Sequence, residues 1–246
     1  METHFYELLA KTERTHWWYA ARREIVRWAM MEALEIAPQG GVIYDLGCGV
    51  GANLSMLEEL GDVIGVDASD VAVANCHANG HANVRQANLE TLDNLPPGSG
   101  RAVLLADVLE HLDDDAGCLA AIHRLLAPGG VLVITVPAFQ ALWGPNDDIS
   151  QHRRRYRRRT LLPMLEKQFR VVHDTYFNTW LLPPIALGRL AQRVLKSDPE
   201  QDGRLPAAPV NELLRRIFRS ELPVISRRVR LPAGVSFLAI AQRSPA

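Results

Sequence analysis

Residues 42–51 read VIYDLGCGVG, an apolar run that ends in an acid and a glycine-rich turn. The pattern predicts a buried strand that delivers Asp45 into a loop, where Gly47, Gly49 and Gly51 let the backbone approach a ligand closely. A β-carbon at these glycines would block the ligand or forbid the positive φ values of the turn. The loop therefore determines the class of ligand, and with it most of the function.

The loop by itself does not identify the ligand. Gly47, Gly49 and Ala52 also satisfy the dinucleotide pattern G-x-G-x-x-G/A, in which a pyrophosphate lies on a helix N-terminus. The sequence after the loop repeats the same design, because further short apolar runs also end in acidic or polar residues. Asp67, at the end of the second run, is placed to bind ribose hydroxyls in either case. The later runs lie at 63–67, 83–90, 103–111 and 131–136, the last one after a Pro-Gly-Gly turn at 128–130.

Four motifs occur in a fixed order: DLGCGVG at 45–51, GVDAS at 65–69, DVLEHL at 107–112 and LAPGGVL at 126–132. Over about residues 41–140 they resemble, motif by motif, the class I S-adenosylmethionine (SAM)-dependent methyltransferases. The resemblance implies SAM as cofactor, S-adenosyl-L-homocysteine as product, and a Rossmann-like α/β fold. In that fold a doubly wound seven-stranded sheet is mostly parallel, its last strand is antiparallel, and ligands bind at the carboxyl ends of the strands.

The resemblance implies a binding role for each polar group at these strand ends. Asp45 acts on the SAM ammonium, Asp67 accepts both ribose hydroxyls because a carboxylate takes two donors, and Asp107 closes the site beside the methionine. The N–H groups of the loop face the methionyl moiety, while Asn88 and Leu89 border the adenine. The implied cofactor-binding residues are Asp45, Gly47, Cys48, Gly49, Gly51, Asp67, Ala68, Asn88, Leu89, Asp107, Val108, Tyr19 and Arg23.

An aromatic and basic segment, HWWYAARR, connects two helices predicted within residues 1–40. The resemblance implies that this part caps the cofactor and the substrate, with Trp18, Tyr19 and one of Arg22 or Arg23 near the methionine end. An arginine there would pair bidentately with the methionine carboxylate. The alternative is that the aromatic side chains pack a helix on the sheet edge and the arginines lie in solvent.

Length and composition fit a single domain over residues 1–246. A chain of this length can bury a full core, and 48% hydrophobic content with alternating strand and helix patterns suits a soluble α/β protein. Cys48, Cys76 and Cys118 lack metal-like or paired spacing, which predicts a reduced, cytoplasmic setting, and the N-terminus shows no signal-peptide pattern. The predicted division is a helical cap at 1–40, a SAM-binding core at 41–140 and an acceptor-side half at 141–246, with a helical insertion at about 177–232.

Charge is distributed unevenly along the chain. Residues 1–140 carry 8 Lys/Arg against 19 Asp/Glu, and residues 141–246 carry 19 against 9. The basic half is therefore expected to meet something anionic, or else to attract the acidic half or a second subunit. Its densest part is residues 153–159, where six arginines surround Tyr156. Such a cluster could contact phosphates and stack on bases, as in an RNA-binding surface.

A second interpretation of the same segment is an acceptor pocket. A His-x-x-Arg-Tyr segment after the fifth strand also lines the acceptor pocket of small-molecule methyltransferases that this chain resembles. His152 and Tyr156 would then contact the acceptor, and Arg154 or Arg155 would bind an anionic group. A third interpretation is a solvated turn that leads into a short helix beginning near Leu161.

The end of the fourth strand carries Asp107, Glu110 and His111. His111 is suited to act as a general base, because the pKa of histidine lies near neutral pH. Alternatively, the three side chains, spaced i, i+3 and i+4, share a helical face and hold a divalent metal, or they only shape the turn. We assign His111, His152 and Tyr156 as catalytic candidates and assign no metal centre.

The segment between the sixth strand (169–176) and the last strand (235–241) is apolar and then amphipathic with cations. It is too short, and too broken by Pro183 and Pro184, to span a bilayer. It could lie on an anionic membrane surface or cover a lipid-linked acceptor. The alternative is a helical lid or a homodimer interface.

The predicted function is transfer of a methyl group from SAM to an oxygen or nitrogen of a small or lipid- or glycan-linked acceptor. The protein is expected to be cytoplasmic, with peripheral contact to the inner face of the membrane. One alternative is an RNA or protein methyltransferase that uses the arginines of residues 153–159. The others are a non-catalytic SAM-binding module and, more distantly, a nicotinamide oxidoreductase.

Overall fold

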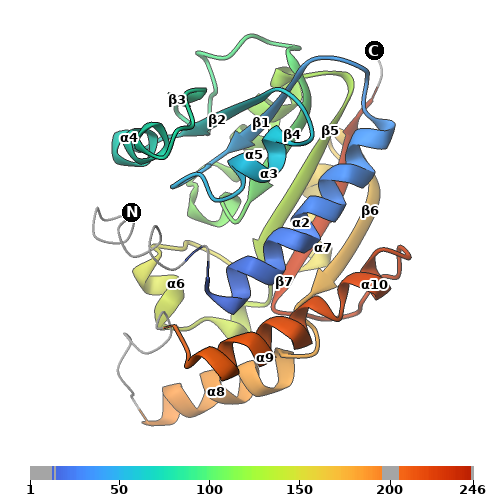
Figure 1. Cartoon of the computed structure of the whole chain (residues 1–246). Helices are drawn as coiled ribbons and strands as arrows, with labels where there is room; N and C mark the ends of the chain where they lie inside the picture. Colours follow the sequence, from blue (N-terminus) through green and yellow to red (C-terminus); the bar gives the residue numbers. More distant parts are fainter. Residues whose placement is uncertain (1–12, 14, 196–204, 245–246) are drawn as a thin grey trace.

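The computed structural model describes residue 13, residues 15–195 and residues 205–244, which form one seven-stranded sheet with helices on both faces (Figure 1). The strand order is β3-β2-β1-β4-β5-β7-β6. β1 pairs in parallel with β2 and β4, β2 with β3 and β4 with β5, whereas β7 is antiparallel to β5 and β6. The predicted doubly wound sheet with an antiparallel last strand is confirmed. The strands are β1 (Val42–Leu46), β2 (Val63–Asp67), β3 (Val84–Gln86), β4 (Gly100–Ala106), β5 (Leu126–Pro137), β6 (Phe169–Phe177) and β7 (Ser236–Arg243).

Helices connect most of the strands, and short 3-10 turns follow β4 and β5. The first of the two helices predicted before the sheet falls mostly on residues 1–12 and 14, which lie outside the described residues. The helices are α2 (Trp17–Ile36), α3 (Leu54–Glu58), α4 (Asp70–Ala78), α5 (Asp115–Leu125), α6 (Pro145–Ile149), α7 (Arg158–Leu165), α8 (Leu182–Leu195), α9 (Ala208–Arg219) and α10 (Leu222–Ile225), and the 3-10 turns span Leu109–His111 and Gln140–Leu142.

Both faces of the sheet are buried, because successive strand residues point to opposite faces and helices cover each one. Leu104 packs in a core cluster with Ile25 of α2, on the face that α2 crosses in Figure 1. Its neighbour Leu105 packs with Ile122 of α5 on the opposite face. The central strands therefore read as continuous apolar runs, and their ends are fixed between two packed layers.

The parallel register brings the acidic strand ends together. Asp45 of β1 lies in register with Gly65 of β2 and with Leu104 of β4. Asp67 ends β2, and Asp107 follows the last residue of β4. All three carboxylates therefore lie at the same carboxyl edge of the sheet, where open α/β sheets bind their ligands.

The predicted helical insertion before the last strand is present as α8, α9 and α10, between β6 and β7. α9 is fixed to the start of α2 by Asn211, whose side chain accepts a hydrogen bond from the Trp17 N–H at 2.9 Å and donates one to the Thr15 carbonyl at 2.9 Å. The ring of Phe218 also meets that of Trp17, with centroids 6.1 Å apart. Among the described residues, no helix is both long and apolar enough to cross a membrane.

Candidate active site

The glycine loop after β1 has the conformation that its sequence predicts. Gly47, Gly49 and Gly51 have φ values of 73°, 55° and 88°, in the left-handed region that favours glycine. A β-carbon on Gly47 would lie 2.3 Å from Val108 Cγ2, whereas one on Gly49 would meet no described atom within 4 Å. The loop thus packs tightly against the end of β4 on one side and leaves room beside its backbone on the other.

Asp45 is a buried acid without a hydrogen-bond partner for one oxygen. Its residue is 1% exposed, and among the described residues nothing hydrogen-bonds Oδ2. Burial raises the pKa of this carboxyl to about 7, while the Arg22 guanidinium opposes the rise. Such a group is suited to a cationic partner that restores its charge, as the ammonium of SAM would.

Asp67 makes contacts that the sequence analysis did not foresee. Its Oδ2 accepts the Gly49 N–H at 2.9 Å, and its Oδ1 accepts the Ser69 N–H at 2.9 Å. Burial raises its pKa, and the backbone N–H groups around it act in the opposite direction. Each carboxylate oxygen has two acceptor sites, so one remains on each for a ribose hydroxyl. Asp67 therefore ties the glycine loop to the end of β2 and keeps acceptor capacity for a ligand.

The remaining residues assigned to the adenine side lie at the ends of β2 and β3. Leu89 is buried, whereas Asn88 and Ala68 are exposed. The Asn88 side chain accepts the Glu90 N–H at 2.8 Å, and the Ala68 carbonyl accepts a hydrogen bond from Gln86 at 3.0 Å. Cys48 is buried, and contact with Cys76 and burial raise the pKa of its thiol. Because the Cys48 side chain is buried, its backbone is the part that can contact a ligand.

The sequence predicts either Arg22 or Arg23 near the methionine end, and Arg22 is the one that lies at the end of β4. Its Nε pairs with Asp107 Oδ2 at 2.8 Å, with both side chains largely buried, and its guanidinium lies 5.0 Å from the Trp18 ring centre. Arg23 instead donates to the carbonyls of Ala52 and Glu13. Helical periodicity could have distinguished the two arginines in the sequence. Arg22 shares the buried face of α2 with Ala21, Ile25, Val26 and Ala29.

Tyr19 lies in the same region as Trp18, Arg22 and Asp107. Its ring packs edge-on against Trp18, with centroids 5.0 Å apart. Burial raises the pKa of its hydroxyl, and the negative charges of Glu13 and Asp107 act in the same direction. A neutral phenol near Asp107 can donate a hydrogen bond or pack against a ligand.

A second group of polar side chains, Glu110, His111 and His152, lies just beyond Asp107. One ligand-type atom from each residue lies within 4.8 Å of the others, and the two imidazole rings meet edge-on at 4.7 Å. Glu110 is fully buried, and neither of its oxygens has a hydrogen-bond partner in the described part of the chain. Burial raises the pKa of Glu110 well above its usual value, and burial lowers the pKa of His111 to about 4. We call these three residues the acceptor-side cluster.

The local backbone differs from the predicted helical face. Asp107 has a φ of 56°, and only Leu109–His111 form a 3-10 turn. The expectation that Asp107, Glu110 and His111 share one helical face is therefore wrong, because the left-handed Asp107 turns its side chain toward Arg22. His152, from the segment after β5, occupies the place beside Glu110 and His111 instead.

The arginine-rich segment is mostly neutralised by carboxylates of the protein itself. Arg155 pairs with Asp147 at 2.8 Å, and the other pairs are Arg153 with Asp113 at 2.9 Å, Arg154 with Asp115 at 2.9 Å and Arg158 with Asp174 at 2.8 Å. Tyr156 is buried, and its hydroxyl donates to Asp115 at 2.9 Å. The arrangement joins the segment to the rest of the molecule, since the Tyr156 hydroxyl lies within hydrogen-bond distance of Asp115 on α5 and, at 3.4 Å, of the Leu109 carbonyl.

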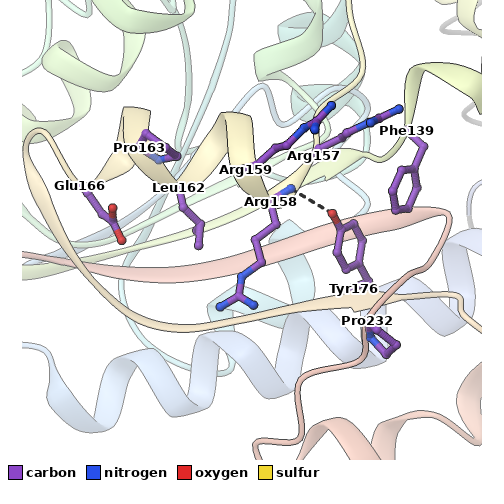
Figure 2. Close-up of a pocket in the computed structure, with 9 residues that line it drawn as sticks. All are labelled: Phe139, Arg157, Arg158, Arg159, Leu162, Pro163, Glu166, Tyr176 and Pro232. Carbon is purple, nitrogen blue, oxygen red and sulfur yellow. Dashed lines mark hydrogen bonds between the residues drawn. The ribbon is translucent and has the colours of Figure 1, made fainter.

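The helix after this segment begins earlier than predicted, at Arg158 and not near Leu161, because the Thr160 hydroxyl accepts the Arg157 N–H at 2.9 Å. Arg157 lies over the Phe139 ring at 5.8 Å. A shallow pocket of about 530 Å³ lies here. Figure 2 shows the residues that line it: Phe139, Arg157, Arg158, Arg159, Leu162, Pro163, Glu166, Tyr176 and Pro232.

Comparison with known proteins agrees with the site geometry. Residues 44–134 match a protein family described as a methyltransferase domain. A probable SAM-dependent methyltransferase of Mycolicibacterium smegmatis is 33% identical over 100 residues, which are 40% of this chain and 38% of that protein. A ubiquinone biosynthesis O-methyltransferase of Methylococcus capsulatus is 35% identical over 99 residues, 38% of this chain and 42% of that protein. The matches thus span less than half the length of these relatives.

Solved structures share the whole fold at lower identity. A SAM-dependent methyltransferase from Archaeoglobus fulgidus superposes with a TM-score of 0.57 at 22% identity, covering 90% of this chain and 94% of that one. A geranyl diphosphate C-methyltransferase from Streptomyces coelicolor, solved with S-adenosyl-L-homocysteine, gives 0.55 at 18% identity, covering 92% and 76%. With the motif order and the acidic strand ends, these matches show a methyltransferase domain over residues 44–134, in a chain whose fold is shared with SAM-dependent methyltransferases.

Proposed function

We propose that the protein transfers the methyl group of SAM to an oxygen or nitrogen of a small or lipid-linked acceptor. The observation that carries the proposal is the buried Asp45, whose Oδ2 lacks a hydrogen-bond partner among the described residues beside the open backbone of Gly49. A buried carboxylate in that state is costly unless a cation approaches it. SAM brings an ammonium to that place and supplies a methyl group on a positively charged sulfur.

The chain's own residues would hold SAM along the carboxyl edge of the sheet. Asp45 binds the ammonium, Asp67 accepts the ribose hydroxyls, and the backbone of the glycine loop packs against the methionyl part. The expectation that the loop N–H groups face the methionyl part does not hold for most of them, because those of Gly47 and Cys48 donate to the Val66 carbonyl, that of Gly51 to the Cys48 carbonyl and that of Gly49 to Asp67. Arg22 is already paired with Asp107 at 2.8 Å, so it can share its remaining N–H groups with the methionine carboxylate. Tyr19 and Trp18 cover this end and exclude water.

The acceptor would approach from the side of Glu110, His111 and His152. Glu110 and His111 lie three and four residues after Asp107, and His152 lies beside them, so we place the cluster next to the methionine end. In-line approach of the acceptor's nucleophile supplies much of the acceleration of methyl transfer. We assign His111 and His152 to contact with the acceptor, and we assign Tyr156 to positioning, because its hydroxyl already bonds Asp115.

The enzymatic proposal is tested with tritium-labelled SAM. We expect the native chain to label a small-molecule or lipid fraction of a cell extract. The matched control, Gly47→Ala, should label none, because its loop cannot bind SAM. Label in the RNA or protein fraction would contradict the acceptor class, and native SAM binding without any labelled fraction would favour the non-catalytic alternative.

We further propose that the helical insertion contacts the inner face of an anionic membrane, where a lipid-linked acceptor would lie. Large exposed apolar side chains concentrate on and around α8 and α9: Trp180, Leu187, Leu190, Leu205, Val210 and Leu213. Leu187 is 69% exposed, yet α8 and α9 also pack on a common core through Ile185 and Leu214. Amphipathic helices of this kind bind membrane surfaces through apolar area and cationic side chains.

Liposome flotation tests this contact. The native chain should float with vesicles of phosphatidylcholine and phosphatidylglycerol, and high salt should weaken the binding because it screens the cationic part. Leu187→Glu combined with Leu213→Glu should reduce flotation, whereas Met31→Glu, at a 49% exposed position on α2, should not. Equal flotation of all three chains, or none by the native chain, would contradict the proposal.

A further inference from the structure

We propose that Glu110, His111 and His152 bind one divalent transition-metal ion beside the methyl-transfer site. The three side chains come from two segments far apart in the sequence, and each offers one ligand atom within 4.8 Å of the others. His152 Nε2 lies 3.9 Å from Glu110 Oε1, which is too far for a hydrogen bond. The residues therefore surround a common point without satisfying one another.

Glu110 is the first indication of a bound metal ion. It is fully buried, and both of its oxygens lack hydrogen-bond partners within the described ranges. A buried carboxyl with two unsatisfied oxygens costs free energy, because it has lost water and gained nothing. A metal ion would satisfy the carboxylate and the two neutral imidazoles at once.

His152 supplies the second indication of a metal ion, because its Nδ1 is already engaged. His152 Nδ1 lies 2.7 Å from Asp147 Oδ1, and the same carboxylate accepts hydrogen bonds from Arg155 and from the Gly144 N–H. Carboxylate or carbonyl partners on the far nitrogen are the usual support of metal-binding histidines, since they fix the tautomer and orient the ring.

The backbone holds the two segments against each other. The Arg153 N–H donates to the Glu110 carbonyl at 2.8 Å, and the Arg153 Nε donates to the His111 carbonyl at 3.1 Å. Metal–ligand bonds of about 2.1 Å require ligand atoms closer than about 4.2 Å. The widest separation, 4.8 Å, therefore has to shrink on binding, which side-chain rotation on this fixed backbone can supply.

The donor set indicates the kind of metal. Two imidazole nitrogens and one carboxylate suit Zn²⁺, Co²⁺ and their first-row neighbours, whereas Mg²⁺ and Ca²⁺ prefer oxygen ligands alone. Three protein ligands also leave coordination positions open. If the proposed methyl transfer holds, an acceptor oxygen could take an open position, and the metal would orient it and lower the pKa of its hydroxyl.

The three proposed metal ligands differ from the set that sequence spacing offers, which is Asp107, Glu110 and His111. Asp107 is engaged with Arg22 at 2.8 Å and accepts a hydrogen bond from Thr135 at 3.3 Å. His152 takes its place in the cluster, and no local sequence pattern links it to Glu110, 42 positions earlier.

The experiment titrates the metal-free full chain with Co²⁺, followed by visible absorption and by calorimetry. We expect one equivalent per chain and a ligand-field spectrum of nitrogen and oxygen coordination. His152→Ala and Glu110→Gln should each weaken binding at least about tenfold, and Asp147→Asn should weaken it by about 10- to 100-fold through loss of orientation. His123→Ala, a histidine on α5 outside the cluster, should bind Co²⁺ like the native chain.

Thermal unfolding of each metal-free variant shows whether it is folded. Glu110→Gln removes only a charge, so it provides a folded test if His152→Ala is unstable. Absence of saturable Co²⁺ uptake by the native chain, or unchanged uptake by Glu110→Gln and His152→Ala, would overturn the metal site. SAM binding measured on the same samples separates the two proposals, because a failed metal site leaves it intact.

Discussion

Gly47→Ala is expected to abolish measurable SAM binding and to lower the free energy of unfolding by about 3 kcal/mol. Two costs add. The backbone at Gly47 has a φ of 73°, which a residue with a β-carbon adopts only with strain, and the new methyl group would lie 2.3 Å from Val108 Cγ2. The loop or the end of β4 has to move, and either movement changes the surface that the loop backbone would offer to the methionyl part.

Two further variants separate these costs. Gly98→Ala, at a φ of 71° with no described atom within 4 Å of the new β-carbon, should show only the backbone strain of about 1 kcal/mol. Val108→Ala in the Gly47→Ala background should recover part of the stability, because it removes the atoms that clash. Calorimetry with SAM and thermal unfolding measure both effects. Native SAM affinity in Gly47→Ala would show that the loop does not bind the cofactor.

The cofactor side of the site could be predicted from the sequence because its parts are local. Asp45, Asp67 and Asp107 each end an apolar strand, and parallel pairing of neighbouring strands places such ends at one edge. The glycines of the loop specify their own conformation. What escaped prediction there is the double role of Asp67, because its bond to Gly49 depends on how closely the loop folds back on β2.

The acceptor side could not be predicted because its contacts join distant segments. Residues 153–159 look like a solvated cationic surface in sequence, yet Asp113, Asp115, Asp147 and Asp174 pair with four of their arginines. Those acids have no periodic relation to the arginines, so only the fold brings them together. These ion pairs also weaken the nucleic-acid interpretation, since engaged guanidinium groups have fewer donors left for phosphates.

The error at the end of β4 has a specific cause. The spacing of Asp107, Glu110 and His111 fits a helix only if all the residues have helical backbones. Asp107 has a positive φ, so its backbone is not helical. Aspartate tolerates this region better than most residues do, but the residue type alone does not predict it. The same backbone conformation lets the Asp107 side chain form its ion pair with Arg22.

Asp67→Ala is the second variant with a large expected effect, a loss of SAM affinity of at least about tenfold. The change removes two acceptors for ribose hydroxyls and also the carboxylate that holds the Gly49 and Ser69 N–H groups at 2.9 Å. Hydrogen bonds to charged groups contribute about 1.5–3 kcal/mol each, so the loss of several is enough for the effect. Asp67→Asn keeps the size of the side chain and one acceptor oxygen, and it should fall between the native chain and Asp67→Ala. Asp70→Ala, an exposed acid three residues later, is the matched control and should bind SAM like the native chain.

The most direct test of the account is calorimetric titration of the native chain and Asp67→Ala with SAM and, in parallel, with NAD. We expect one SAM bound per native chain, at least about tenfold weaker binding by Asp67→Ala, and no binding of NAD by either. Unchanged SAM affinity in a folded Asp67→Ala chain would contradict the site, and preferential binding of NAD by the native chain would contradict the cofactor itself.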